Sequence, residues 1–151
     1  MSDYTSTIST SASAQTAYHA LTTGFANWWT KPQGLLENVG DRAKFGFPPG
    51  ISYWTFEATR LSPNTFVEMK CVEALHKHEG QPEAIETEWL GTRVTFQIEE
   101  TAKGSSIRMV HIGLRQSLLC FDICTAGWDH FFGGSLKAYL DTGTGMPHRA
   151  G

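Results

Sequence analysis

A chain of 151 residues is long enough for one domain with a substantial core and too short for two ordinary ones, so we expect a single domain over residues 1–151. Its residues are 40% hydrophobic and 18% charged, a composition that is typical of globular proteins and excludes disordered and fibrous classes. The net charge of −3, without any cluster of Lys or Arg, provides no field that attracts phosphate, so no nucleic acid is expected as a partner.

The cysteines and the N-terminal residues indicate a cytoplasmic protein. Three cysteines, an odd number at no familiar metal spacing, argue for a reducing compartment rather than a secreted disulfide framework. The first 15 residues are polar and contain neither the basic nor the apolar segment of a secretory signal. No apolar run approaches the ~20 residues that a membrane span needs, so no membrane span is expected.

The first predicted elements are an edge strand and a short helix. Residues 4–9 alternate weakly between polar and β-branched side chains, which favours a strand at a sheet edge. Ser13 is a suitable N-cap for a helix whose apolar face is formed by Ala14, Ala17, Tyr18 and Leu21. Gly24 is expected to end this helix by adopting the left-handed conformation.

A group of large aromatic residues follows at once, formed by Phe25, Trp28 and Trp29. It predicts a second short helix or a packed turn, because so much apolar surface does not suit a simple loop. Pro32 and Gly34 are expected to stop this element.

Residues 40–114 favour β structure. Strands are predicted over residues 42–47, 51–61 and 65–74, and the breaks between them, rich in Pro, Gly and Asn, are short enough for hairpins. Residues 76–84 are polar and contain a glycine and a proline, which predicts a loop.

That loop contains an H-x-H-E cluster formed by His76, His78 and Glu79. We interpret the cluster as part of a solvated loop rather than a metal site, because no further ligand occurs at a diagnostic spacing. The chain also lacks the motifs of nucleophile elbows, phosphate loops and metalloprotease helices. No metal, cofactor or catalytic residue is therefore assigned.

For two later strands the sequence predicts which side chains face the interior. The strand over residues 92–99 has one buried and one wet face, and the buried face carries Val94, Phe96 and Ile98. After a turn at residues 103–104, strand parity places His111 on the same side as Ile107 and Met109. That side is the one expected to face the interior.

Residues 124–139 carry the clearest helical pattern. A stripe of mostly apolar residues recurs at steps of three and four, formed by Cys124, Trp128, Phe131, Phe132, Ser135, Leu136 and Tyr139. Gly133 and Gly134 lie in the middle of this helix, where each costs roughly 1 kcal/mol relative to alanine, and we expect either a closely crossing strand or loop beside them or a widened cavity. Residues 142–147 are expected to end the helix and leave a short mobile tail.

These elements predict an α+β fold. A long antiparallel sheet has an apolar face, and the amphipathic C-terminal helix is the element available to bury it. Because such a sheet twists and coils, it is expected to wrap around that helix, with two short helices after the first strand. This geometry tends to leave a hollow between sheet and helix.

Parts of the sequence resemble a known family, in the segments SASAQTAYHALT (11–22), EWLGTRVTFQI (88–98), SIRMVHIGL (106–114) and GWDHFFGGSLKAYLDTGTGMP (127–147). The chain is similar to the START-like, Bet v 1-like SRPBCC superfamily, in the branch of the C-terminal domain of the activator of Hsp90 ATPase (AHSA1-like). The resemblance implies a helix-grip fold with a hydrophobic cavity. Such folds occur in carriers of apolar ligands, in aromatase/cyclase enzymes and in co-chaperones, so the fold alone does not choose the function.

The candidate ligand-binding residues are those expected to face the cavity. Aromatic and sulfur-containing side chains would form apolar walls, and His111 would either orient a ligand or be a hydrogen-bonded core histidine. The predicted set is Trp54, Phe56, Met69, Phe96, Met109, His111, Trp128 and Phe132.

We expect a non-enzymatic domain that binds a small apolar or amphipathic molecule, and two alternatives remain open. One is a protein-interaction role like that of the Hsp90 activator, although direct action on an Hsp90-type chaperone is not expected because only the C-terminal-type domain is present. The other is a cyclase or dehydratase with His111 as acid or base and Tyr53 or Tyr139 nearby. The edge strand and the Trp28–Trp29 pair also leave a homodimer open.

Overall fold

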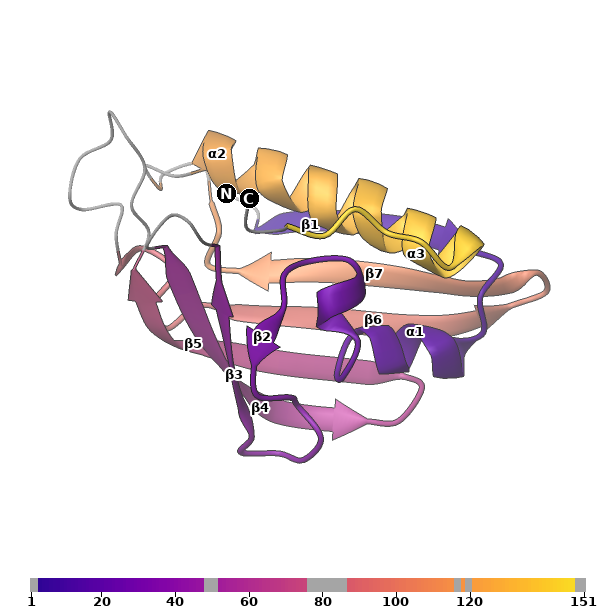
Figure 1. Cartoon of the computed structure of the whole chain (residues 1–151), viewed down its shortest axis with the longest axis horizontal. Coiled ribbons are helices and arrows are strands. Elements are labelled where there is room, and N and C mark those ends of the chain that lie inside the picture. Colours follow the sequence, from indigo (N-terminus) through magenta and orange to yellow (C-terminus); the bar gives the residue numbers. More distant parts are fainter. Residues whose placement is uncertain (1–2, 48–51, 76–86, 116–117, 119–120, 149–151) are drawn as a thin grey trace.

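One curved antiparallel sheet forms the framework of the molecule (Figure 1). The structure is a computed structural model and describes residues 3–47, 52–75, 87–115, 118 and 121–148. In these ranges the strands are β1 (Tyr4–Thr10), β2 (Pro32–Gln33), β3 (Arg42–Gly46), β4 (Tyr53–Ser62), β5 (Phe66–Leu75), β6 (Arg93–Thr101) and β7 (Gly104–Ile112). Their order across the sheet is β1-β7-β6-β5-β4-β3-β2. β1 is therefore an edge strand, as predicted.

The predicted strands are confirmed apart from small shifts at their ends. The sequence did not predict β2, whose Pro32 and Gln33 pair with Phe45 and Lys44 of β3. The predicted loop over residues 76–84, with its H-x-H-E cluster, lies outside the described residues, and so do Cys120 and the break at residues 48–50. The described part of the chain contains no group of three or more His, Cys, Asp or Glu that could hold a metal ion.

The helices cover one face of the sheet. They are α1 (Ala14–Ala20), the short 3-10 helix η1 (Phe25–Asn27), and a C-terminal helix made of α2 (Phe121–Trp128), the π-helical η3 (Asp129–Leu136) and α3 (Lys137–Thr142). Figure 1 shows the C-terminal helix running along the sheet beside β1, with α1 on the same side of the sheet. The predicted helix-grip fold is confirmed. No helix among the described residues is long and apolar enough to cross a bilayer.

Helix α1 begins as predicted and ends differently. The hydroxyl of Ser13 accepts a hydrogen bond from the Thr16 N–H at 3.1 Å, which satisfies a free donor of the first turn. Gly24 was expected to be left-handed, but its φ is −103°. The chain instead leaves the helix through a wide turn, in which the His19 carbonyl accepts from both Thr23 and Gly24 at 3.0 Å.

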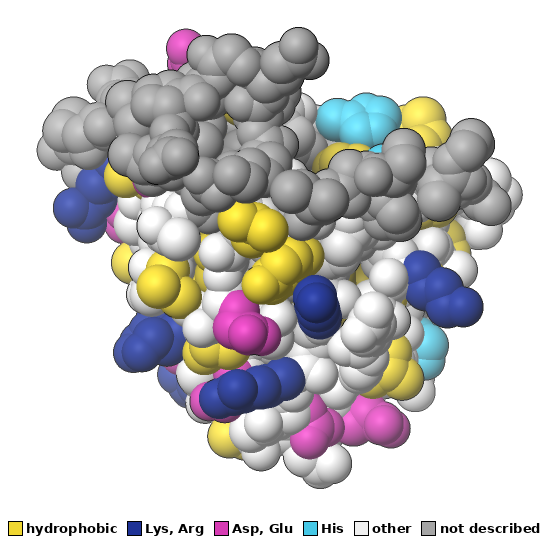
Figure 2. Space-filling model, turned by 60° about the vertical axis from the view of Figure 1, so that its left-hand side comes forward, with side chains coloured by type: hydrophobic (Ala, Val, Ile, Leu, Met, Phe, Trp, Pro, Cys, Tyr) yellow, Lys and Arg dark blue, Asp and Glu magenta, His cyan; other side chains and the backbone are white. Residues whose placement is uncertain are grey.

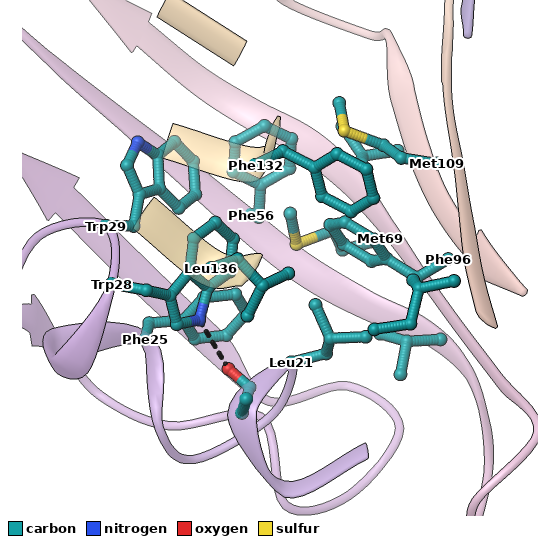
Figure 3. Packing of buried hydrophobic residues seen from close by; sticks show 14 of the residues in the cluster. Leu21, Phe25, Trp28, Trp29, Phe56, Met69, Phe96, Met109, Phe132 and Leu136 are labelled. Atoms are coloured by element: carbon teal, nitrogen blue, oxygen red, sulfur yellow. Dashed lines mark hydrogen bonds between the residues drawn. The ribbon is translucent and has the colours of Figure 1, made fainter. Parts of the chain in front are cut away.

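The middle of the interface between sheet and helix is packed with apolar side chains (Figure 3). Phe132 and Leu136 of the C-terminal helix are fully buried and point toward the sheet. The rings of Phe132 and Phe96 lie 6.0 Å apart. Because burying a side chain of this size contributes about 1.5–3 kcal/mol, this packing is the main attachment of the helix.

Two irregularities bend the hairpin between β4 and β5. The pairing register shifts between Thr55 and Phe56 and again between Ala58 and Arg60. Extra residues of this kind increase local twist and re-aim neighbouring side chains. The first shift lies directly beside Trp54, which is buried next to the end of the C-terminal helix that begins at α2.

The C-terminal helix ends within residues 142–147, as predicted, and the tail expected beyond them lies outside the described residues apart from His148. Gly143 ends the helix with a φ of 87°, and the chain then folds back along the molecule. The Met146 N–H donates to the Ser135 hydroxyl at 2.7 Å, and the His148 N–H donates to the Trp29 carbonyl at 2.6 Å. A Cβ on Gly145 would lie 2.4 Å from a backbone oxygen, so only glycine permits this close approach.

Neither predicted reason for the glycine pair in the helix applies. A Cβ at Gly133 would meet no described atom within 4 Å, and one at Gly134 would reach Met146 only at 3.7 Å. No strand or loop of the described chain therefore crosses closely, and neither glycine lines the cavity described below. Both lie instead in the π-helical segment η3, which the sequence pattern did not predict.

In the structure, both sequence features that left a homodimer open make contacts within the chain. Trp28 and Trp29 are 0% and 3% exposed, so this pair offers no surface to a second copy of the chain. The edge strand β1 is tied to the C-terminal helix, because Lys137 donates to the Ser9 carbonyl at 2.6 Å. Figure 2 shows Lys and Arg side chains interspersed with Asp and Glu on the face that it presents.

Candidate functional site

An apolar pocket remains where α2 meets the curved sheet. Its volume is about 230 Å³, below the ~300–1,000 Å³ typical of sites for drug-sized ligands. The described residues that line it come from the segment after η1, the residue after β3, the start of β4 and the residue before it, the turn before β6, and the C-terminal helix. They are Trp29, Phe47, Ser52, Trp54, Trp89, Ile123, Cys124, Gly127, Trp128 and Phe131.

The predicted ligand-binding residues divide into two groups. Trp54 and Trp128 line the pocket. The other six are 0% exposed, do not line it, and belong to the packed core: Phe56, Met69, Phe96, Met109, His111 and Phe132. Figure 3 shows five of these six packed against one another and against helix residues, with their own side chains filling the space where a ligand was expected.

Five rings in contact form a closed circuit around the pocket, which we call the aromatic belt. In spatial order the belt consists of Trp29, Trp128, Trp89, Trp54 and Phe47, and all five line the pocket. Successive ring centroids lie 5.0, 5.8, 4.6 and 5.5 Å apart, and the closing distance from Phe47 to Trp29 is 6.2 Å. Distances of this size are typical of favourable aromatic pairs, so the belt is a coherent wall.

His111 holds two members of the belt through a chain of hydrogen bonds. The Trp128 indole N–H donates to His111 Nδ1 at 3.1 Å. Because Nδ1 accepts, the proton of the neutral ring lies on Nε2, which donates to Thr92 Oγ1 at 2.8 Å. The Thr92 hydroxyl then donates to the Trp89 carbonyl at 2.6 Å. The histidine thus links the Trp128 side chain to the Trp89 backbone.

The same contacts leave His111 without a nitrogen for a ligand. Burial lowers the pKa of His111 from 6.5 to about 3, because the charged form loses its hydration, while the charge of Asp3 opposes this shift. The Trp89 ring also packs edge-on against the imidazole at 4.6 Å. His111 is therefore a neutral, hydrogen-bonded core residue that positions the belt.

Tight local turns place Trp89. Its carbonyl accepts from both the Thr92 N–H at 2.9 Å and the Thr92 hydroxyl. Gly91 has a φ of 84°, a left-handed conformation that suits glycine, and its N–H donates to the Cys71 carbonyl at 2.9 Å. The turn is thereby fixed to β5, and the indole is held against the pocket.

The pocket contains few polar groups. Among the described lining residues there is no Lys, Arg, His, Asp or Glu, and the polar side chains besides the indoles are those of Ser52 and Cys124. The indole N–H of Trp89 is buried and has no hydrogen-bond partner within the described residues. A lining of this kind recognises ligands through apolar and π contacts rather than through ion pairs.

A second, more open hollow of about 610 Å³ lies toward the opposite end of the C-terminal helix. Two of the charged residues that line it bind each other: Asp141 accepts from Lys137 at 2.9 Å, and it also accepts from the Thr10 hydroxyl at 2.5 Å. The hydrogen bond from Thr10 is the main reason that the pKa of Asp141 lies below its usual value. These contacts attach β1 to α3, which is a structural role.

The pocket also contains residues that were absent from the predicted ligand-binding set. Trp29, Phe47 and Trp89 complete the belt, yet they come from three separate segments of the chain. The available signal was the count of five tryptophans in 151 residues, which indicates an aromatic cluster without giving its members.

Comparisons with known proteins give similarity to solved structures alone. No family model matches the chain, and no curated protein matches it. The Aha1 dimer from Colwellia psychrerythraea is 30% identical, with a TM-score of 0.75, over 96% of this chain and 100% of that one. MLL2253 from Mesorhizobium loti is 22% identical, with a TM-score of 0.69, over 86% and 90% of the two chains. DynU16, of the dynemicin biosynthetic locus, is 15% identical, with a TM-score of 0.71, over 96% of this chain and 49% of that one.

Proposed function

The chain belongs to the activator of Hsp90 ATPase (AHSA1-like) branch of the START-like SRPBCC superfamily, and on that premise we propose that it is a non-enzymatic binding domain. Its ligand is a small hydrophobic or amphipathic molecule that lies against the aromatic belt. The observation that carries the proposal is the pocket of about 230 Å³, which remains beside four tryptophans although the middle of the interface between sheet and helix is packed.

The size and lining of the pocket limit the affinity that a ligand can reach. Removing roughly 200 Å² of apolar ligand surface from water would contribute about 5 kcal/mol, and part of this is offset by lost translational and rotational freedom. We therefore expect affinities from micromolar to millimolar for small probes. Selectivity comes from shape and π contacts, because the described lining offers no charged group.

A ligand search on the whole protein tests the proposal. Native mass spectrometry of protein purified from its own cells should show an added mass that solvent extraction removes. A library of apolar fragments should raise the melting temperature, because a molecule that binds only the folded state stabilises it. No added mass together with a flat response across the library would refute the binding function.

The geometry gives the enzymatic alternative little support. Both ring nitrogens of His111 are occupied by Trp128 and Thr92, and burial keeps the imidazole neutral. The Tyr139 hydroxyl accepts from Asn27, and the Tyr53 ring lies under the Lys44 ammonium at 4.2 Å. None of these groups faces a reacting atom in the pocket as general acid–base chemistry requires.

We also propose self-association as a second role, because the similar structure from Colwellia psychrerythraea is described as a dimer. The test is light scattering coupled to gel filtration over a range of protein concentrations. A mass of twice the chain that falls on dilution supports the role, and a constant mass of 16.7 kDa refutes it.

A further inference from the structure

We propose that the pocket selects a quaternary ammonium cation, a trimethylammonium group at the end of a short chain. This inference rests on the proposed binding function and adds the chemical class of the ligand. It follows from the shape of the aromatic belt, from the absence of charged groups and from the shortage of hydrogen-bond acceptors in the described lining.

The first step is the size of the belt. A regular ring of five points, with sides equal to the mean of the centroid distances given above, has a radius of roughly 4.6 Å, within the ~6 Å over which aromatic faces attract cations. A cation near its centre would lie within this distance of all five centroids, but the nearly parallel rings of Trp89 and Trp128, with 5° between their planes, do not both turn a face squarely toward it. The ring of Phe56, in the packed core, lies 6.4 Å from Trp29 and 6.2 Å from Trp89.

The second step is the sign of the charge. Indole presents the most negative face of the aromatic side chains, and four of the five belt members are tryptophans. No Lys, Arg or His is among the described lining residues to repel a cation or to bind an anion. The net charge of −3 on the whole chain acts in the same direction.

The third step separates quaternary from primary ammonium. A primary ammonium carries three N–H donors, and burying them without acceptors is costly. A trimethylammonium group has no N–H and presents only methyl groups to the rings. The pocket of about 230 Å³ has room for such a group with a short tail.

Calorimetric titration with matched probes tests the charge. The probes are choline, its uncharged carbon analogue 3,3-dimethylbutan-1-ol, and ethanolamine, at constant ionic strength. We expect choline to bind at least tenfold more tightly than either of the others. Equal or tighter binding of the uncharged alcohol would overturn the cation proposal and leave the binding function standing. No choline binding, with apolar fragments still bound, would also overturn it.

A substitution that preserves shape adds a second readout. Tryptophan labelling with 5-fluorotryptophan and then 5,7-difluorotryptophan makes the ring faces progressively less negative while leaving their size nearly unchanged. Choline affinity is expected to fall with each added fluorine, and the affinity of the uncharged alcohol to stay within twofold. Choline affinity that does not change across the series would contradict the proposal.

Two single substitutions, one inside the belt and one outside it, show where choline binds. Trp54→Phe keeps a ring in the belt but weakens its attraction for a cation, and Trp28→Phe makes the same change outside the belt. Trp28 donates its indole N–H to the Ala20 carbonyl at 2.8 Å (Figure 3) and does not line the pocket. With folding verified by circular dichroism, the Trp54 variant should lose several-fold more choline affinity than the Trp28 variant. Equal losses would place the binding site elsewhere.

Discussion

Filling the pocket from its helical wall is the sharpest test of where a ligand binds. Gly127 of α2 lines the pocket, and a Cβ there would meet no described atom within 4 Å. Gly127→Leu should therefore place a side chain in the cavity without a clash. Gly133→Leu is the matched control, because Gly133 has the same open surroundings in the same helix and does not line the pocket.

The expected magnitudes follow from helix propensity and volume. Replacing a helical glycine favours the folded state by about 0.5–1 kcal/mol, so neither variant should lose stability. The four carbon atoms of leucine would occupy roughly half of the cavity of about 230 Å³. A ligand that needs most of that volume should then bind Gly127→Leu at least tenfold more weakly, while its affinity for Gly133→Leu stays within twofold of the unsubstituted protein.

Two measurements on the same samples decide the outcome. Urea unfolding gives the free energy of unfolding of each variant, and calorimetry gives the affinity for whichever probe the unsubstituted protein binds. Unchanged affinity in Gly127→Leu would refute binding in this pocket. A loss of more than about 1 kcal/mol of stability in that variant would show that the space beside Gly127 is already filled.

Three further predictions concern groups outside the belt. The pKa of His111 is about 3 in the folded protein and about 6.5 in the unfolded chain, so between these pH values only the unfolded chain binds a proton at this residue. His111 should therefore lower the free energy of unfolding by about 2 kcal/mol from pH 7 to pH 5, and urea titrations of His111→Gln should lack that loss. Ser135→Ala removes the donor to the Trp28 carbonyl and the acceptor of the Met146 N–H, so it should cost about 1–3 kcal/mol and speed hydrogen exchange at Met146. Burial raises the pKa of Cys71 to about 12, so alkylation at pH 8, mapped by mass spectrometry, should leave Cys71 unmodified until the protein unfolds.

The sheet could be predicted because its signals are local. The alternation of Val94, Phe96 and Ile98 correctly gives the buried side of β6, and parity correctly buries His111 in β7. Ser13 likewise caps its helix through a contact only three residues long. In each case the deciding contact lies within the element or its immediate neighbour.

The pocket could be predicted only in part, because its members meet through tertiary contacts. Parity shows that Phe56 and Met69 face inward, but it does not show whether helix side chains fill the space in front of them. The docking of residues 143–148 depends on a contact between Gly145 and a backbone oxygen more than a hundred residues away, which no local pattern records. The belt combines four separate segments for the same reason.

The close spacing of the belt gives the protein an optical property. Trp89 and Trp128 stack at 5.8 Å with 5° between their planes, and Trp54 lies 4.6 Å from Trp89. Electronic transitions of indoles this close couple to one another and produce paired bands of opposite sign in the ultraviolet circular dichroism spectrum. Since the coupling depends on the relative orientation of the rings, a guest that shifts one indole would change these bands, and occupancy could be followed without an added dye.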